Sequence, residues 1–322
     1  MGAQAGSVQL PVCDHYSGVE VRMRKSLQMQ AEMAEEFGTC VFDVTLDCED
    51  GAPVGGEAEH AALVTELALA STDARPDARV AVRVHPVDHP CFDADVAHIA
   101  GRAGNRLVHL MVPKVESVQD VERAARALDA AGAHQLGLQV LIESPAAVHR
   151  AFDIAAHPRV QSLSFGLMDF VSAHGGAIPS EGMGAQGQFS HPLVVRAKLE
   201  IASACHAHGK VPSHCVVTEF SDPEAMRQSA LRASREFGYT RMWSIHPSQI
   251  RPILEAMAPT AAEIDRASEI VLAAHAAQWA PISHGGQLHD RASYRFFWQL
   301  LERAHRTGQN LPTEVQAWMG AQ

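Results

Sequence analysis

Paired cysteines and long apolar runs are both missing from this sequence, and each absence excludes a class of protein. The six cysteines lie apart without a C-x-x-C pair, so neither a disulfide framework nor a zinc cage is predicted. No stretch reaches the roughly 18 consecutive apolar residues that a membrane-spanning helix needs. The first residues also lack the charged-then-apolar pattern of a signal peptide. We therefore expect a cytoplasmic protein with no membrane partner.

Basic residues are scarce as well. The chain has 26 Lys and Arg against 37 Asp and Glu, which gives a formal net charge of −11, and it contains no basic run. A nucleic-acid groove needs clustered cations to displace counterions, so we expect no nucleic-acid partner. A glycine motif that would cradle the phosphates of a nicotinamide cofactor is also absent. These absences favour an enzyme or binding protein for small molecules.

Short apolar runs alternate with longer amphipathic segments along most of the chain. The runs are rich in Val, Ile, Leu and Phe, as buried parallel strands are, and cover residues 40–48, 79–84, 107–113, 138–143, 160–166, 211–217 and 241–247. A weaker run at 19–27 is predicted to be the first strand. Helical patterns between them cover 57–70, 92–102, 117–131, 145–156, 192–208 and 222–237. This alternation predicts a (β/α)8 barrel over 19–258, with an open doubly wound sheet as the alternative.

Neither end of the chain follows this alternation of strands and helices. Residues 1–18 are expected to form an N-terminal arm. Residues 259–322 are predicted to form a C-terminal helical extension, with helices at 260–278 and 290–306 and a turn between them. The extension looks too short to build a core of its own.

Charged side chains close several of the predicted strands. In a parallel barrel the carboxyl ends of the strands converge on one concave face, so these side chains are expected to meet there. Buried carboxylates need cations, which basic side chains or a hard divalent ion would supply. Mg²⁺ takes one or two carboxylates and keeps several waters. The residues concerned are Asp47, Glu49, Asp50, Arg83, Lys114, Glu116, Glu143 and Asp169.

Six segments in this order resemble the citrate lyase beta subunit and malyl-CoA lyase family, which is related to the HpcH/HpaI aldolases. They are 46-LDCEDGAP-53, 82-VRVHP-86, 112-VPKVES-117, 141-LIESPAAV-148, 164-SFGLMDF-170 and 244-SIHPSQI-250. The resemblance covers roughly residues 40–260. It implies a TIM barrel that breaks carbon–carbon bonds with Mg²⁺, with Mn²⁺ as an alternative ion.

The resemblance also implies roles for individual residues. Glu143 and Asp169 match the two metal ligands, and Arg83 matches the arginine that grips a carboxylate or carbonyl oxygen of the substrate. Glu49 and Asp50 match acidic groups beside the metal, which makes Glu49 a fallback base and places Asp50 near the substrate.

Three further residues match positions of the family, and for two of them an alternative role stays open. Lys114 is expected either to pair with the acidic cluster or to contact substrate, and Gly166 to line the substrate site. The run 285-GGQLHDRASYRFFWQLLERA-304 aligns Asp290 with a proton donor that often acts in a neighbouring subunit; a helix N-cap is the alternative. The resemblance thus predicts a homo-oligomer, a trimer or hexamer, with the extension exchanged between subunits.

Two departures from the family weaken the prediction that the substrate contains coenzyme A. The segment 22-RMRKSLQMQ-30 lacks the family's Pro-Gly turn, and His214 stands where an aspartate is common. The residues after Asp169, 174–188, are glycine-rich and predict either a lid or a plain loop.

The predicted function is a Mg²⁺-dependent lyase for a small 3-hydroxy acid or its coenzyme A thioester, acting through an enolate. The alternatives are a hydroxyacyl-CoA thioesterase using the same site and a non-catalytic binding subunit of a lyase complex.

Overall fold

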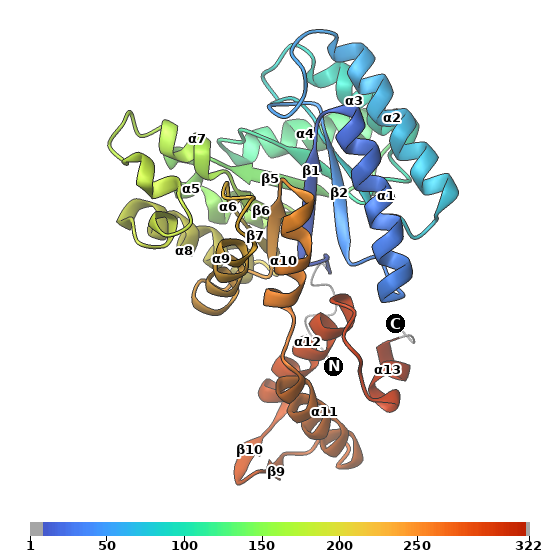
Figure 1. Cartoon of the computed structure of the whole chain (residues 1–322), viewed down its shortest axis with the longest axis vertical. Coiled ribbons are helices and arrows are strands. Elements are labelled where there is room, and N and C mark those ends of the chain that lie inside the picture. The colour runs from blue at the N-terminus through green and yellow to red at the C-terminus, as the bar shows by residue number, and fades with distance from the viewer. Residues whose placement is uncertain (1–8, 320–322) are drawn as a thin grey trace.

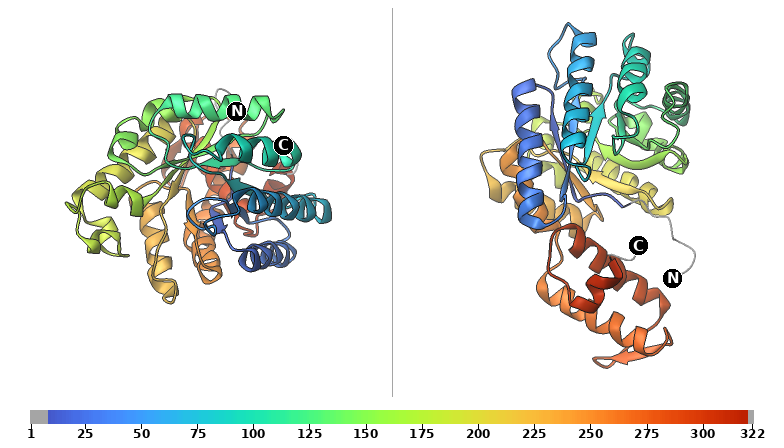
Figure 2. Two further views of the ribbon diagram at one scale, coloured as in Figure 1. Left: turned by 90° about the horizontal axis from the view of Figure 1, so that it is seen from above. Right: turned by 90° about the vertical axis from the view of Figure 1, so that its right-hand side faces the viewer.

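A closed barrel of eight parallel strands forms the body of the protein in the computed structural model, which describes residues 9–319 (Figures 1 and 2). Each strand pairs in parallel with the next, and the last pairs with the first. The strands are β1 (Cys13–Ser17), β2 (Phe42–Asp47), β3 (Val80–Arg83), β4 (Leu110–Val112), β5 (Leu138–Ile142), β6 (Val160–Phe165), β7 (Val211–His214) and β8 (Arg241–Ser244). The predicted (β/α)8 barrel is confirmed.

Helices follow the strands and cover the outside of the barrel (Figure 2). They are α1 (Glu20–Phe37), α2 (Glu57–Ala74), α3 (Phe92–Ala103), α4 (Val118–Ala130), α5 (Pro145–His149), α6 (Ala151–Ala156), α7 (Leu167–Ser172), α8 (Pro192–Ala207), α9 (Pro223–Glu236) and α10 (Ile250–Met257). Short 3-10 turns η1 (Ser180–Met183), η2 (Gly187–Phe189) and η3 (Pro247–Gln249) lie in the loops. Ser117 and Asp120 form a capping box at the start of α4, as their spacing predicts.

The first strand is where the sequence-based prediction was wrong. Residues 19–27 were expected to be a strand, but helix α1 begins at Glu20, and β1 is Cys13–Ser17, inside the segment assigned to the N-terminal arm. The buried residues of α1, including Met23, Gln30 and Met33, recur at helical spacing. β1 has no aliphatic run because its side chains Asp14 and Tyr16 take part in polar and aromatic contacts inside the barrel. The barrel therefore starts at Cys13.

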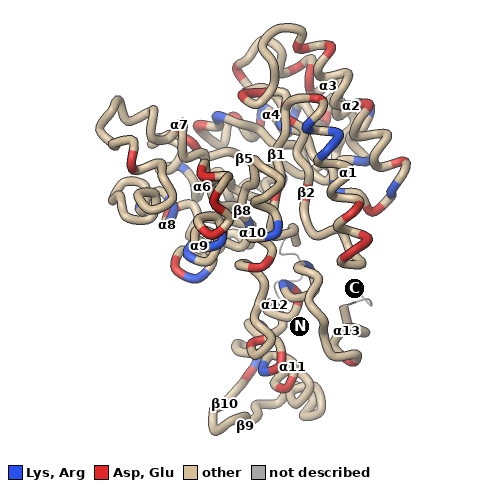
Figure 3. Tube along the Cα trace, in the orientation of Figure 1, with Lys and Arg blue, Asp and Glu red and all other residues tan. Residues whose placement is uncertain are grey.

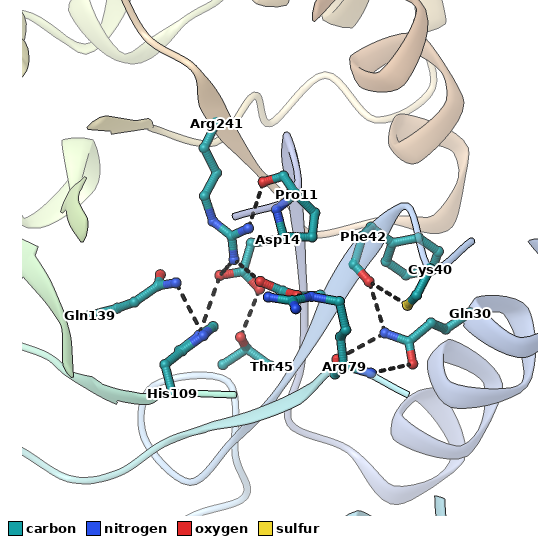
Figure 4. Close-up of polar contacts among 11 residues, drawn as sticks. Pro11, Asp14, Gln30, Cys40, Phe42, Thr45, Arg79, His109, Gln139 and Arg241 are labelled. Atoms are coloured by element: carbon teal, nitrogen blue, oxygen red, sulfur yellow. Dashed lines mark hydrogen bonds and ion pairs between the residues drawn. The ribbon is translucent and has the colours of Figure 1, made fainter. Parts of the chain in front are cut away.

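A charge network fills the barrel near the amino ends of its strands (Figure 4). Arg241 Nη2 lies 2.6 Å from Asp43 Oδ2 and 2.8 Å from Asp14 Oδ2, and all three residues are fully buried. Arg79 Nε donates to Asp43 Oδ1 at 2.6 Å. Burial acts to raise the pKa of Asp43, but Arg79 and Arg241 together hold it below its usual value. Two arginines thus balance two buried carboxylates.

An aromatic and aliphatic cluster, which we call the plug, lies above this network. It consists of Tyr16, Met111, Leu141 and Trp243, from strands β1, β4, β5 and β8. These residues precede the strand ends, whereas Asp14, Asp43 and Arg241 lie near the strand beginnings. The plug therefore separates the charge network from the carboxyl-end mouth of the barrel.

The C-terminal extension comprises α11 (Ala261–Ala276), β9 (Ile282–His284), β10 (Gln287–His289), α12 (Arg291–Arg306) and α13 (Thr313–Met319). Contrary to expectation, it has an apolar cluster of its own, which includes Ile270, Tyr294 and Leu301. The predicted turn between its helices is an antiparallel hairpin, with Gly285 and Gly286 at positive φ. Helix α10 runs back along the barrel, so the extension lies at the end opposite the mouth (Figure 1).

Along the Cα trace of Figure 3, positions of Lys and Arg are interspersed with positions of Asp and Glu. Within residues 9–319, no helix is both long enough and apolar enough to span a bilayer.

Replacing Arg241 tests the charge network. Arg241→Leu leaves the Asp14 and Asp43 carboxylates without their shared cation, so we expect a loss of about 3–5 kcal/mol in the free energy of unfolding, measured in urea. The matched control is Arg251→Leu, which breaks an exposed pair with Glu36 and should cost at most about 1 kcal/mol. Equal effects of the two substitutions would contradict the assignment.

Candidate active site

The barrel mouth brings together an arginine and two carboxylates from neighbouring strands. Asp47 ends β2 and Arg83 ends β3, and the parallel register places the two residues opposite each other. Arg83 Nε and Nη2 donate to Asp47 Oδ1 and Oδ2 at 2.7 and 2.5 Å, and Arg83 Nη1 lies 3.1 Å from Glu49 Oε2. Burial acts to lower the pKa of Arg83, but Asp47 and Glu49 raise it above its ordinary value. The guanidinium is thereby fixed in place and fully charged.

Asp47 is the residue for which the sequence offered no specific role. Its carboxylate accepts hydrogen bonds from the backbone N–H groups of Glu49 at 2.9 Å and Gly51 at 2.8 Å, besides its pair with Arg83. Asp47 therefore shapes the loop that carries Glu49 while it holds Arg83. This role follows from the position of Asp47 opposite Arg83 in the β2–β3 register, and a sequence pattern does not give that register.

Lys114, which follows β4, contacts the acidic loop after β2 that carries Glu49 and Asp50. Its Nζ forms an ion pair with Glu49 and lies 3.3 Å from Asp50 Oδ2. Burial acts to lower the pKa of Lys114, but contact with Glu49 and Asp50 raises it above its usual range. The salt-bridge alternative for Lys114 is the one that the geometry supports, while direct substrate contact stays a prediction.

The backbone at Lys114 points toward the candidate metal ligands. Lys114 has φ 52°, a left-handed conformation that is uncommon for residues other than glycine. Its backbone N–H donates to Glu143 Oε1 at 2.6 Å. Such strained positions persist where surrounding contacts hold them and often occur at active sites. Here the left-handed turn aims a backbone donor at Glu143.

Glu143 directly follows β5 and Asp169 follows β6, as predicted. Glu143 is 5% exposed, and burial together with the neighbouring Asp169 carboxylate raises its pKa to about 8. Asp169 lies in the first turn of α7. Gly166 leaves room for this pair, because a Cβ there would lie 2.5 Å from Glu143 Cβ and 2.5 Å from Oε2. Its role as a substrate-binding residue stays a prediction.

These two carboxylates fit a magnesium ion. Among the ion pairs of the described residues, none supplies Glu143 with a cationic side chain, although it is buried beside a second acid. A bound cation would remove the repulsion that raises its pKa. Within residues 9–319 there is no group of three or more His, Cys, Asp and Glu residues suited to a metal. This excludes, among these residues, a metal site built from three or more such side chains. It is compatible with Mg²⁺, which needs only one or two carboxylates.

Glu116, another acid predicted at the mouth, is turned toward the rim. Its Oε2 accepts from Ser144 Oγ at 2.7 Å, and its carbonyl oxygen accepts from Arg150 Nη1 at 3.0 Å. Ser144 caps α5 by accepting from the Ala147 N–H at 3.0 Å. Glu116 thus supports the loop that carries Glu143.

Asp290 lies far from this mouth within its own chain. It directly follows β10, at the end of the molecule opposite the barrel mouth (Figure 1). The exposed carboxylate caps α12 by accepting from the N–H groups of Ala292 at 3.0 Å and Ser293 at 3.4 Å. Asp290 therefore has the geometry of an N-cap and does not reach the site of its own barrel, and its role as a proton donor stays a prediction.

The segment after Asp169 is anchored to the outside of the barrel. Gln188 in η2 is buried, and its Oε1 accepts from Lys198 Nζ at 2.8 Å and from Cys215 Sγ at 3.1 Å. His214 stacks on Phe189, with ring centroids 5.3 Å apart, and burial lowers its pKa well below the usual value. His214 thus packs against the loop rather than facing the carboxylates.

The corrected first strand also changes the comparison with the family's Pro-Gly turn. Residues 22–30, where that turn was sought, belong to helix α1. The loop after β1 contains Gly18, where a Cβ would lie 2.1 Å from the Gly51 carbonyl oxygen. The end of β1 therefore presses directly on the loop that carries Glu49 and Asp50, and only glycine fits this approach.

Comparison with known proteins agrees with this arrangement. Residues 26–247 match the model of the HpcH/HpaI aldolase/citrate lyase family. The L-malyl-CoA/beta-methylmalyl-CoA lyase of Cereibacter sphaeroides is 31% identical over 262 residues, which cover 76% of this chain and 80% of that lyase.

Solved structures show the same architecture. A crystal structure of a citrate lyase from Burkholderia xenovorans LB400 is 48% identical, with a TM-score of 0.83 over 97% of each chain. Protein CitE from Mycobacterium tuberculosis, in complex with magnesium, acetoacetate and coenzyme A, has a TM-score of 0.66. At 20% identity, over 92% of this chain and 98% of that one, it shows a likeness of fold alone. By its family model and its lyase relative, the chain belongs to the HpcH/HpaI aldolase/citrate lyase family.

Proposed function

We propose that this protein is a Mg²⁺-dependent carbon–carbon bond lyase that acts on a small 3-hydroxy acid or its coenzyme A thioester. The observation that carries the proposal is the buried Glu143 carboxylate beside Asp169, with the fixed cation Arg83 at the same mouth. Breaking a bond beta to a carbonyl leaves an enolate whose oxygen needs positive charge. Mg²⁺, or Mn²⁺, held by Glu143 and Asp169 would supply that charge.

The chain's own residues then have distinct tasks. Arg83 presents a rigid guanidinium for a carboxylate or carbonyl oxygen of the substrate, because Asp47 and Glu49 contact all three of its nitrogens. Glu49 lies between Arg83 and Lys114 and is the fallback base for the substrate hydroxyl. Asp50, which is more exposed, lies at the entrance where it and Lys114 would meet the substrate.

We also propose that Asp290 acts in a neighbouring subunit of a homo-oligomer, a trimer or hexamer. The mouth of its own barrel lies at the opposite end of the molecule from β10, which Asp290 follows (Figure 1). The extension has its own apolar cluster, so it is suited to dock as a unit on another barrel. Exposed apolar side chains near Asp290, Leu288 at 77% and Phe296 at 58%, would be covered by such docking.

The free cysteines suit a reducing compartment, and we propose the cytoplasm.

The decisive experiment offers the protein hydroxyacyl-CoA and free hydroxy acid substrates with Mg²⁺, and measures carbonyl products and free thiol separately. Glu143→Ala and Asp169→Ala should each lower turnover by at least about a hundredfold, because each removes a metal ligand from the mouth. Folding is checked by circular dichroism. Carbonyl release that survives both substitutions or EDTA would contradict the proposal. Thiol released without a carbonyl partner would identify a thioesterase, and activity that needs an added protein would identify a binding subunit.

The raised pKa of Glu143 predicts how pH affects the metal-free protein. The pKa of about 8 in the folded state exceeds 4.5, the ordinary value of a glutamate carboxyl, so the folded state holds an extra proton between these values. Stability of the metal-free protein should therefore fall as pH rises through this window, and Mg²⁺ should restore it most at the upper end. Glu143→Gln should flatten both trends in thermal melts at pH 5–9. A wild-type melting temperature that is indifferent to Mg²⁺ at pH 8.5 would disagree.

Mixing two inactive variants tests whether Asp290 acts between subunits. Asp290→Asn should lower turnover about a hundredfold while Mg²⁺ affinity stays unchanged, because it removes only the proton donor. Co-expression of Glu143→Ala with Asp290→Asn chains should regain part of the activity, since some sites in mixed oligomers then combine an intact Glu143 with an intact Asp290. Unchanged turnover of Asp290→Asn, with full activity, would leave Asp290 only its capping role.

A further inference from the structure

Two aromatic side chains of the plug stack on each other beneath the mouth. The ring centroids of Tyr16 and Trp243 lie 4.4 Å apart with an interplanar angle of 24°. Tyr16 belongs to β1 and Trp243 to β8, the pair of strands that closes the barrel. Each residue is 7% exposed. The stack is therefore part of the barrel interior and is held by two strands whose pairing is fixed.

Arg83 lies over the Tyr16 ring of this stack. Its Cζ is 5.6 Å from the centroid of that ring, a distance at which a cation is attracted to an aromatic face. Tyr16 thus contacts both the guanidinium and the indole. The three groups come from β3, β1 and β8, whereas the metal-binding candidates follow β5 and β6.

The carboxylates at the mouth contact the guanidinium only at its nitrogens. Asp47 binds Nε and Nη2, and Glu49 lies beside Nη1, so all three nitrogens are engaged. Hydrogen bonds of this kind act in the plane of the group and leave its faces to other contacts. The residue two positions earlier on β3, Ala81, has a side chain too small to support Arg83 from below. The face of Tyr16 supplies that support.

We infer that Tyr16 and Trp243 are positioning residues that set the plane of Arg83 toward the substrate. Tyr16 supports the guanidinium directly, and Trp243 supports Tyr16. This inference rests on the proposed function, in which Arg83 binds a substrate oxygen. It assigns to these two rings, and not to Met111 or Leu141, a part in substrate binding besides their part in filling the barrel.

The test compares variants that keep or remove the aromatic ring. Tyr16→Phe keeps the ring under Arg83, and Tyr16→Leu removes it. Oxalate is the probe, because it is a planar anion that resembles the enolate of a small 2-oxo acid. Its affinity is measured by calorimetry with Mg²⁺, alongside the affinity for Mg²⁺ alone, kcat and KM.

Tyr16→Leu should weaken oxalate binding and lower kcat by about ten- to a hundredfold, because a tilted guanidinium misses its oxygen. Affinity for Mg²⁺ alone should not change, since Glu143 and Asp169 remain in place. Tyr16→Phe should stay within about threefold of the wild type, because the ring face is retained. Leu141→Ala is the control, since it opens a cavity in the same plug without removing either stacked ring; it should lower the melting temperature and keep oxalate affinity.

Three outcomes would overturn the inference. Wild-type oxalate affinity in Tyr16→Leu would show that Arg83 needs no ring beneath it. An equal loss in Tyr16→Phe would show that the hydroxyl acts instead of the ring, and an equal loss in Leu141→Ala would show a general packing effect. If Tyr16→Leu does not fold, Trp243→Leu tests the same support, with the same expected direction.

The wild type separates this inference from the proposed function. If the wild type neither binds oxalate with Mg²⁺ nor releases a carbonyl product, the proposed function fails. If the wild type does both and the ring variants match it, only the role of Tyr16 and Trp243 fails.

Discussion

Burial of the Glu143 carboxylate next to Asp169 is the constraint around which the barrel mouth is organised. A buried charge beside a like charge is unfavourable unless a proton or a cation is bound, and burial with the Asp169 charge raises the Glu143 pKa to about 8. The surroundings maintain this arrangement. Gly166 leaves space for the Glu143 side chain, and the left-handed backbone of Lys114 donates a hydrogen bond to it. In the function that we propose, Mg²⁺ is the cation that relieves this repulsion.

The other charges of the mouth are neutralised among themselves. Arg83 and Lys114 pair with Asp47, Glu49 and Asp50, so the cationic side chains of this cluster are engaged on the side of β2 to β4. The metal-binding candidates lie after β5 and β6. In the proposed function, this separation offers the substrate a fixed cation on one side and a metal position on the other, so that positive charge lies on both sides of the enolate oxygen.

The barrel interior is layered along its axis. The lower charge network around Arg241 and the upper charges around Arg83 are separated by the plug, whose ring Tyr16 contacts the upper arginine. An apolar layer between two charged layers limits electrostatic coupling between them and prevents the upper side chains from collapsing inward. The lower network serves stability, whereas the upper one is available for chemistry.

Local sequence patterns were enough to predict the barrel, apart from its first strand, and they name Glu143 and Asp169 as the candidate metal ligands. Apolar strands followed by amphipathic helices have few other solutions, and strand-end acids inside motifs of known order indicate a metal site. The first strand escaped because its inward-facing residues are charged and aromatic, so β1 lacks the apolar pattern on which the prediction depends. The tertiary structure alone decided which acid pairs with Arg83, because that follows from the register of β2 against β3. It also decided that Asp290 lies at the opposite end from its own barrel mouth, since the path of α10 carries the extension there. Contacts between residues far apart in sequence depend on strand register and helix direction, which local patterns do not encode.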